Sequence, residues 1–229
     1  RFWHMLVQSK TFLPMFKWWS PMSVGSWLIL IFPMFLFISF VDALIAMRRL
    51  TVGPWSYRQT LHGSPLGLAW SIVGGFIAFA VTAYSGTLLT ATSFPGWKDS
   101  TVIGALFVAT GLVTGVAAVQ MVQALRGRTE EEDALRLERA STWLLVWWLA
   151  VLAVFLVLGL LSGAARAFLS GPSLVAIVGA ILIGGIAPLV LQRLETRRTR
   201  PRLTAVWAAL ILVGGYLLRY AVVMGPQHG

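Results

Sequence analysis

The chain has no cysteine and only three histidines among its 229 residues. Without cysteine it can form no disulfide, thiolate zinc site, iron-sulfur cluster or C-x-x-C-H haem attachment. The histidines, His4, His62 and His228, lie outside the long apolar runs. This excludes a di-haem cytochrome b type of anchor, and we expect no metal site. Any electron chemistry therefore requires a bound organic cofactor or a partner subunit.

Charged residues are scarce, at 11%, whereas hydrophobic residues make up 58%. The apolar residues form runs of about twenty, the length needed to cross a hydrocarbon core about 30 Å thick. Segments of about ten alternating residues, typical of a transmembrane barrel, do not occur. The sequence predicts an all-α polytopic membrane protein, whose domain of residues 21–229 has six spans. The predicted helices cover about 22–46, 66–90, 101–125, 141–161, 174–191 and 203–223.

The net charge of +10 arises from basic residues in short loops, which is a topology signal and not a sign of nucleic-acid binding. The loops after the first, third and fifth predicted helices hold 12 arginines, and the opposite side holds 5 basic residues. By the positive-inside rule the first set is cytoplasmic. Both ends of the chain are therefore expected on the outer side.

Residues 1–20 mix aromatic and basic residues, including the pair Trp18 and Trp19. This composition is typical of a segment that lies at the membrane-water interface. His4 either faces a site at this surface or is a solvated loop histidine. Because the chain opens at Arg1 without a signal-peptide pattern, we expect its natural N-terminus to lie upstream.

Asp42 lies near the end of the first predicted helix, about two turns before Arg48 and Arg49. A carboxylate inside a span is costly, so one hypothesis gives it a proton-relay or ion-site role. The alternative is an interfacial pair with those arginines.

Other local patterns predict packing and capping. The pair Gly74 and Gly75, and the spacing of Gly111 and Gly115, favour close helix approach. The capping box of Thr129 and Glu132 predicts a helix that begins before the fourth span and continues into it as a solvated extension.

The stretch "AYSGTLLTATS" places Tyr84 and several hydroxyl residues near the end of the second span. The topology puts Tyr84 and Arg219, of the sixth span, in the outer halves of their helices. A phenol donor and a fixed positive charge suit a quinone, whose carbonyl oxygens accept hydrogen bonds. Ser85 and its neighbours would relay protons, or would bond their own backbone carbonyls, as is more common. A tyrosine near a helix end is also typical of an aromatic belt.

Three stretches, "SPMSVGSWLILIF", "AYSGTLLTATSFPGW" and "GGYLLRYAVVMGPQ", resemble the membrane subunits of the NrfD/PsrC family, the polysulfide reductase type. The resemblance implies a haem-free helical bundle in the prokaryotic cytoplasmic (inner) membrane. It implies exchange of electrons between menaquinone or ubiquinone and an extrinsic iron-sulfur subunit, alongside a molybdopterin-type catalytic subunit. It places Tyr84 at the quinone and Arg219 nearby as an electrostatic influence. The residue patterns themselves add Ser85, His4 and Asp42 as further candidate site residues.

The resemblance also implies eight helices, so two more are expected before Arg1, and they would supply further quinone contacts. Two alternatives remain. A transporter or proton channel lined by Asp42 and Arg219 predicts discontinuous helices around a central cavity. A membrane anchor without turnover predicts an iron-sulfur partner but no quinone-dependent activity.

Overall fold

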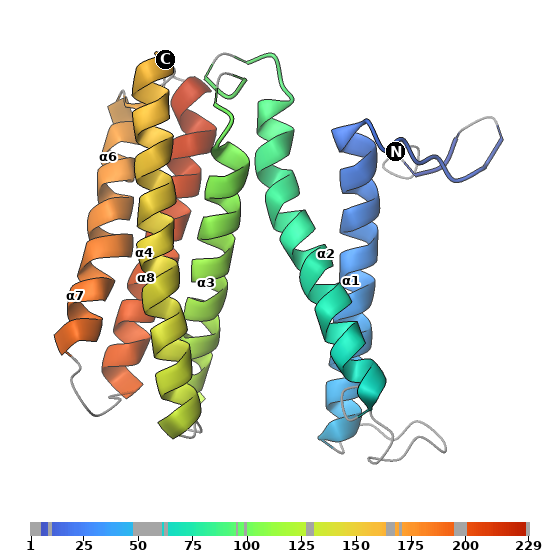
Figure 1. The fold of residues 1–229 in the computed structure, drawn as a ribbon, viewed down its shortest axis with the longest axis horizontal. Helices are drawn as coiled ribbons and strands as arrows, with labels where there is room; N and C mark the ends of the chain where they lie inside the picture. The colour runs from blue at the N-terminus through green and yellow to red at the C-terminus, as the bar shows by residue number, and fades with distance from the viewer. Residues whose placement is uncertain are drawn as a thin grey trace. The chain divides into compact units, whose positions relative to one another are not determined.

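A computed structural model describes residues 6–8, 11–47, 61, 64–94, 96–98, 100–126, 131–163, 168–169, 171–194 and 201–227. Within these ranges the chain has six helices that are long and apolar enough to cross a membrane, which confirms the predicted all-α polytopic fold (Figure 1). The chain divides into two compact units, Arg1–Leu88 and Leu89–Gly229, which we describe one at a time.

The first unit consists of the N-terminal segment and two helices, α1 (Pro21–Ala46) and α2 (Pro65–Thr90, of which the last two residues belong to the second unit). Ser20 is extended and Pro21 occupies the first helical turn, where a missing N–H costs nothing. Both helices lie within one residue of their predicted limits. Only a few of their residues are buried, among them Ser23, Gly25, Gly67 and Gly86.

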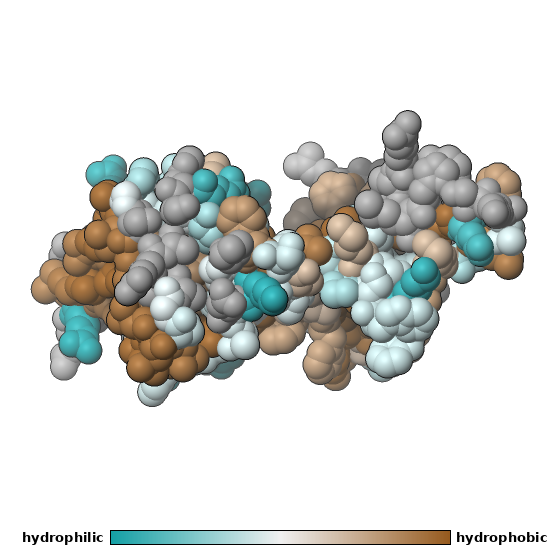
Figure 2. Space-filling model, turned by 90° about the horizontal axis from the view of Figure 1, so that it is seen from above, coloured by the Kyte–Doolittle hydropathy of each residue, from teal (hydrophilic) through white to brown (hydrophobic). Residues whose placement is uncertain are grey.

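The second unit is a bundle of four spans. They are α3 (Ile103–Arg126), α4 (Glu131–Ser162), the continuous run of α6 (Gly171–Gly179), η4 (Ala180–Ile186) and α7 (Ala187–Leu194), and α8 (Pro201–Met224), which ends in η5 (Gly225–Gln227). Seen end-on, the flanks of this bundle carry hydrophobic side chains (Figure 2). The apolar flanks are the surface expected to face lipid.

Three tryptophans, Trp97, Trp148 and Trp207, are buried in the core of the second unit. Trp148 and Trp207 are each 1% exposed. The Trp148 indole N–H donates to Thr110 Oγ1 at 2.9 Å, and the Trp97 indole N–H donates to the Val222 carbonyl oxygen at 2.8 Å. The indole N–H groups of Trp148 and Trp97 thus both have acceptors, as a membrane interior requires. The second bond fastens the segment before α3 to the end of α8.

The predicted extension of the fourth span is confirmed, because α4 is a single helix of 32 residues. At a rise of about 1.5 Å per residue it is about 48 Å long, well over the thickness of a hydrocarbon core. Thr129, the predicted cap, lies outside the described residues. The ion pair of Glu132 and Arg136 on the extension is 76% and 71% exposed, so it stabilises the helix little.

The fifth span contains a π-helical segment, η4, that the sequence analysis did not predict. Its physical cause is Pro188, in the first turn of α7, which has no N–H to offer the Gly184 carbonyl and whose ring crowds that oxygen. A wider turn relieves this crowding, and the Ala187 N–H bonds the Leu182 carbonyl oxygen, five residues back.

The closest helix approach lies at this segment, where Gly184 faces Gly214 of α8. A Cβ added to Gly184 would lie 2.5 Å from the Gly214 Cα, so the two backbones are in direct contact. Gly75 and Gly115, which the sequence analysis assigned to close packing, have nothing within 4 Å of an added Cβ. That part of the prediction was wrong: small residues at helical spacing permit close approach but do not require it.

Candidate functional site

The Tyr84 side chain packs directly on the backbone of Gly25, in the second turn of α1. A Cβ added to Gly25 would overlap the Tyr84 ring, with Cζ, the carbon that bears the hydroxyl, as the nearest atom. Glycine is therefore required where the phenol end of Tyr84 crosses α1. The contact places the hydroxyl beside the end of the helix pair at which α1 begins.

This contact belongs to a regular antiparallel pairing of α1 with α2. Gly25 meets Tyr84, Phe35 meets Gly74, and Ser39 meets Trp70, and the residue numbers of each pair add up to 109. Buried Ser23 and Gly86, and buried Asp42 and Gly67, fall on the same register. Tyr84 thus lies on the same antiparallel register as the other two contacts between α1 and α2.

The hydroxyl residues around Tyr84 bond to the carbonyls of their own helix. Ser85 donates to the Thr82 carbonyl oxygen at 2.8 Å, and Thr87 donates to that of Tyr84 at 3.0 Å. Thr82 donates to the Ala78 carbonyl oxygen at 2.8 Å. Of the two possibilities given for these hydroxyls, the structure thus shows bonds to their own backbone carbonyls and not a proton relay. Ser85 is exposed, on the surface of α2.

The Tyr84 hydroxyl, in contrast, forms no hydrogen bond with any residue that the structure describes. Tyr84 as a whole is half-buried. A phenol O–H in an apolar surrounding favours an acceptor, because an unpaired polar group there is costly. The Tyr84 hydroxyl is therefore a candidate donor for an acceptor outside the described residues.

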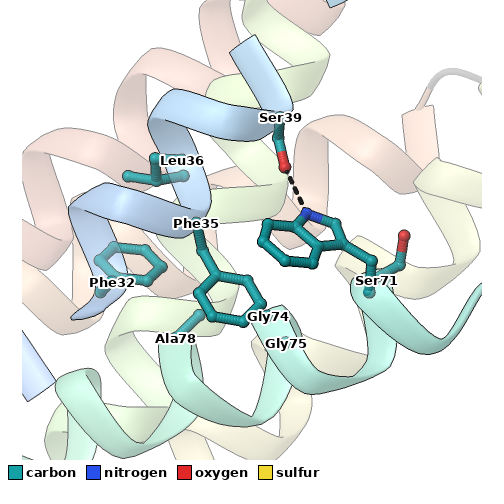
Figure 3. Close-up of a pocket in the computed structure, with 9 residues that line it drawn as sticks. Phe32, Phe35, Leu36, Ser39, Ser71, Gly74, Gly75 and Ala78 are labelled. Atoms are coloured by element: carbon teal, nitrogen blue, oxygen red, sulfur yellow. Dashed lines mark hydrogen bonds between the residues drawn. The ribbon is translucent and has the colours of Figure 1, made fainter. Parts of the chain in front are cut away.

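An apolar groove of about 280 Å³ lies between α1 and α2 (Figure 3). Phe35 and Trp70 stack across it with ring centroids 4.1 Å apart. The Trp70 indole N–H donates to Ser39 Oγ at 2.9 Å, so this polar atom already has its partner. The groove is lined by Phe32, Phe35, Leu36, Ser39, Trp70, Ser71, Gly74, Gly75 and Ala78.

The groove and Tyr84 share one helix pair. Ala78, the lining residue nearest to Tyr84 along the chain, lies six residues before it, or about 9 Å along the axis of α2. The groove is open to its surroundings, and its volume falls below the roughly 300 Å³ of typical small-molecule pockets. It suits an apolar part of a ligand rather than a whole one.

Asp42 is buried at 8% exposure near the far end of α1. Its Oδ1 accepts the backbone N–H of Leu61 at 2.6 Å, which ties the chain before α2 to α1. A charge-assisted bond of this kind stabilises the end of the helix pair. Arg48 and Arg49, its proposed partners, lie outside the described residues. The structure thus gives Asp42 a structural task that neither sequence hypothesis contained.

Arg219 lies on α8 in the second unit and is exposed there. Its guanidinium carbon lies 5.6 Å from the centroid of the Phe107 ring, within cation-π range. It forms no ion pair with the described part of the chain. Tyr84 and Arg219 belong to different units, so each is placed within its own unit. His4 lies outside the described residues.

Sequence reasoning missed Gly25, the groove and the bond between Trp70 and Ser39. Gly25 stands inside one of the stretches quoted for the family resemblance, but a glycine in a motif does not reveal which ring it accommodates. Within the described ranges, no three His, Cys, Asp or Glu side chains gather as a metal site would require.

These features define the class: an integral membrane protein with six helical spans among the residues that the structure describes. A family model described as Polysulphide reductase, NrfD matches residues 1–228. The chain therefore belongs to the NrfD family. No curated protein matches it at a significant level.

Proposed function

We propose that the chain is the quinone-interacting membrane subunit of a respiratory oxidoreductase complex, with the quinone headgroup bound at Tyr84. The observation that carries this proposal is the Tyr84 hydroxyl, held over Gly25 without an acceptor among the described residues. A quinone carbonyl oxygen is an acceptor of the required kind, and lipid-soluble quinones reach such a position from the bilayer. Family membership supports the same conclusion.

In this proposal each residue has a limited task. Tyr84 donates a hydrogen bond to one quinone oxygen and orients the ring. Arg219 contributes positive charge from the outer half of its own span, as the loop charges of the sequence predict. The bound quinone supplies the two-electron chemistry that the side chains of this chain lack.

The groove of α1 and α2 is proposed to hold part of the isoprenoid tail. Its walls are aromatic and aliphatic and its floor is formed by small residues, Gly74, Gly75 and Ala78. Because Trp70 and Ser39 satisfy each other, an apolar chain entering the groove displaces few polar contacts. The distance from Tyr84 then requires a tail longer than about 9 Å, the rise of six helical residues.

The proposed partners are an extrinsic iron-sulfur subunit and a molybdopterin-type catalytic subunit, with both ends of this chain on the outer side of a prokaryotic cytoplasmic membrane. The excess of basic residues in alternate loops supports that orientation. Each of the six described spans runs continuously, whereas the transport alternative predicts discontinuous helices.

Filling the groove tests this assignment. Gly75 lines the groove and an added Cβ there has nothing within 4 Å, so the side chain of Gly75→Leu is expected to fill part of the groove. We expect it to weaken photolabelling of α1 and α2 by a long-tailed azidoquinone about 10-fold, the cost of one lost apolar contact of 1 to 2 kcal/mol. Labelling by a short-tailed azidoquinone should change little. The measurement is peptide mapping of the labelled complex in lipid.

Val73→Leu is the matched control, since Val73 is 48% exposed and does not line the groove. If long- and short-tailed probes respond alike to Gly75→Leu, the groove does not hold the tail. If the wild-type chain is not labelled between Pro21 and Thr90 at all, the quinone assignment itself fails.

Moving Tyr84 without removing it is a second test. Gly25→Ala forces the phenol ring away from α1, and we expect quinol turnover to fall about 10-fold to 100-fold, because small misplacements of a contact group have effects of that size. The double variant Gly25→Ala with Tyr84→Phe should be little worse than Tyr84→Phe alone. Turnover losses that multiply in the double variant would show that Gly25 acts by another route.

A further inference from the structure

The segment of residues 11–20, which we name the aromatic segment, turns its large apolar side chains outward. The five residues Phe12, Leu13, Phe16, Trp18 and Trp19 are between 59% and 75% exposed. Exposed apolar residues are ordinary within membrane helices, but this segment precedes the first helix. Something outside the described chain must cover it.

The segment is nevertheless ordered by its backbone. Val7 and Pro14 form an antiparallel bridge, the Met15 N–H donates to the Leu6 carbonyl oxygen at 2.7 Å, and the Phe12 N–H donates to that of Gln8 at 2.8 Å. Phe12 has a φ of 54°, a left-handed conformation that is unfavourable for a residue other than glycine. The hydrogen bonds hold this strained turn, and the turn directs the Phe12 ring away from the protein.

Two further bonds tie the aromatic segment to the start of α1. The Trp27 indole N–H donates to the Met15 carbonyl oxygen at 3.1 Å, and the Lys17 N–H donates to Ser23 Oγ at 3.0 Å. With 26 residues, α1 is about 39 Å long and exceeds a hydrocarbon core of about 30 Å, so its ends reach the level of the lipid headgroups when it spans a membrane. The segment is thus held at the membrane surface.

We infer that the aromatic segment inserts Phe12, Leu13 and Phe16 into the phospholipid leaflet at which α1 begins and thereby sets the depth of that helix end. Its composition fits a lipid surface: tryptophans at the level of the headgroups, apolar side chains at the turn, and the exposed Lys17 ammonium for lipid phosphates. The depth matters to the chemistry because Gly25, on which Tyr84 packs, follows Pro21 by one turn of α1.

The absence of cysteine makes a direct test possible, because a single introduced thiol labels one position. The full chain carrying Leu13→Cys is labelled with an environment-sensitive fluorophore and reconstituted in vesicles of phosphatidylcholine and phosphatidylglycerol. We expect quenching by acyl-chain brominated lipids at a depth of about 5–10 Å and protection from aqueous iodide. The same label at Arg139→Cys, on the exposed extension of α4, should be quenched by iodide.

A second variant removes only the inserted ring. Phe12→Gly suits the φ of 54° and therefore keeps the turn, but we expect the label at position 13 to lose lipid quenching and gain iodide quenching. Iodide quenching of the original label equal to that at position 139 would overturn the inference. So would protection from both quenchers that arises only when a partner subunit is bound, or a Phe12→Gly variant with an unchanged quenching profile.

Discussion

Replacing Tyr84 with phenylalanine should lower quinol turnover about 100-fold, the usual effect of losing one well-placed donor at a reacting oxygen. The substitution removes the hydroxyl but keeps the ring that packs on Gly25. The helix pair should therefore fold and assemble as before, and the loss should be one of chemistry. The measurement is steady-state turnover of the purified complex with a quinol donor or quinone acceptor.

Tyr216→Phe is the matched control, because Tyr216 is a tyrosine of a membrane span that is 69% exposed on α8. Its loss should leave turnover within about twofold, as for a surface substitution away from a site. If the Tyr84 variant retains full turnover while the complex stays intact, Tyr84 is not the donor, and the aromatic-belt interpretation of this residue holds instead.

Of the substitutions proposed for this chain, Gly214→Ala should lower the free energy of unfolding the most. Its new Cβ would overlap the backbone of Gly184 on the π-helical segment, and backbone cannot move aside by changing rotamer. Overpacking usually costs about 1–3 kcal/mol, and a clash between two backbones belongs at or beyond the upper end of that range. We expect a lower Tm and less folded protein extracted from the membrane.

The control is Gly115→Ala, since Gly115 is also in the middle of a helix but has nothing within 4 Å of an added Cβ. Alanine is the better helix former, so this variant should be neutral or more stable by up to about 1 kcal/mol. Equal losses in the two variants would contradict the assignment of the Gly184 and Gly214 contact as the tight crossing of the bundle.

The spans were predictable because each is a long apolar run, and lipid leaves a backbone few choices but to satisfy its own hydrogen bonds. The extension of α4 was predictable for a local reason as well, its acidic first turn. The π-helical segment was not predicted, although Pro188 carries a signal for it. A proline inside an apolar run shows that the helix must adapt, but not whether it kinks, ends or widens.

The sequence did not predict which residues of neighbouring helices contact one another. The pattern singled out Gly74 and Gly75 as packing residues, and only Gly74 has a neighbour, Phe35, close to an added Cβ. Tyr84 could be chosen from its odd position in an apolar span, but its contact with Gly25 depends on a register set by many side chains at once. The groove arises from the same register and had no signal in either helix alone.

The bond from Leu61 to Asp42 has a consequence for events at the opposite membrane surface. Gly25 lies 17 residues from Asp42 along α1, about 26 Å, yet the two positions belong to one pairing of α1 with α2. A slip of this pairing by a single residue would rotate the contact face of α2 by about 100° and carry the phenol off Gly25. We therefore expect the carboxylate at one end of the helix pair to help fix the position of the phenol at the other, and Asp42→Asn, which keeps an oxygen for Leu61, separates this mechanical effect from any loss of charge.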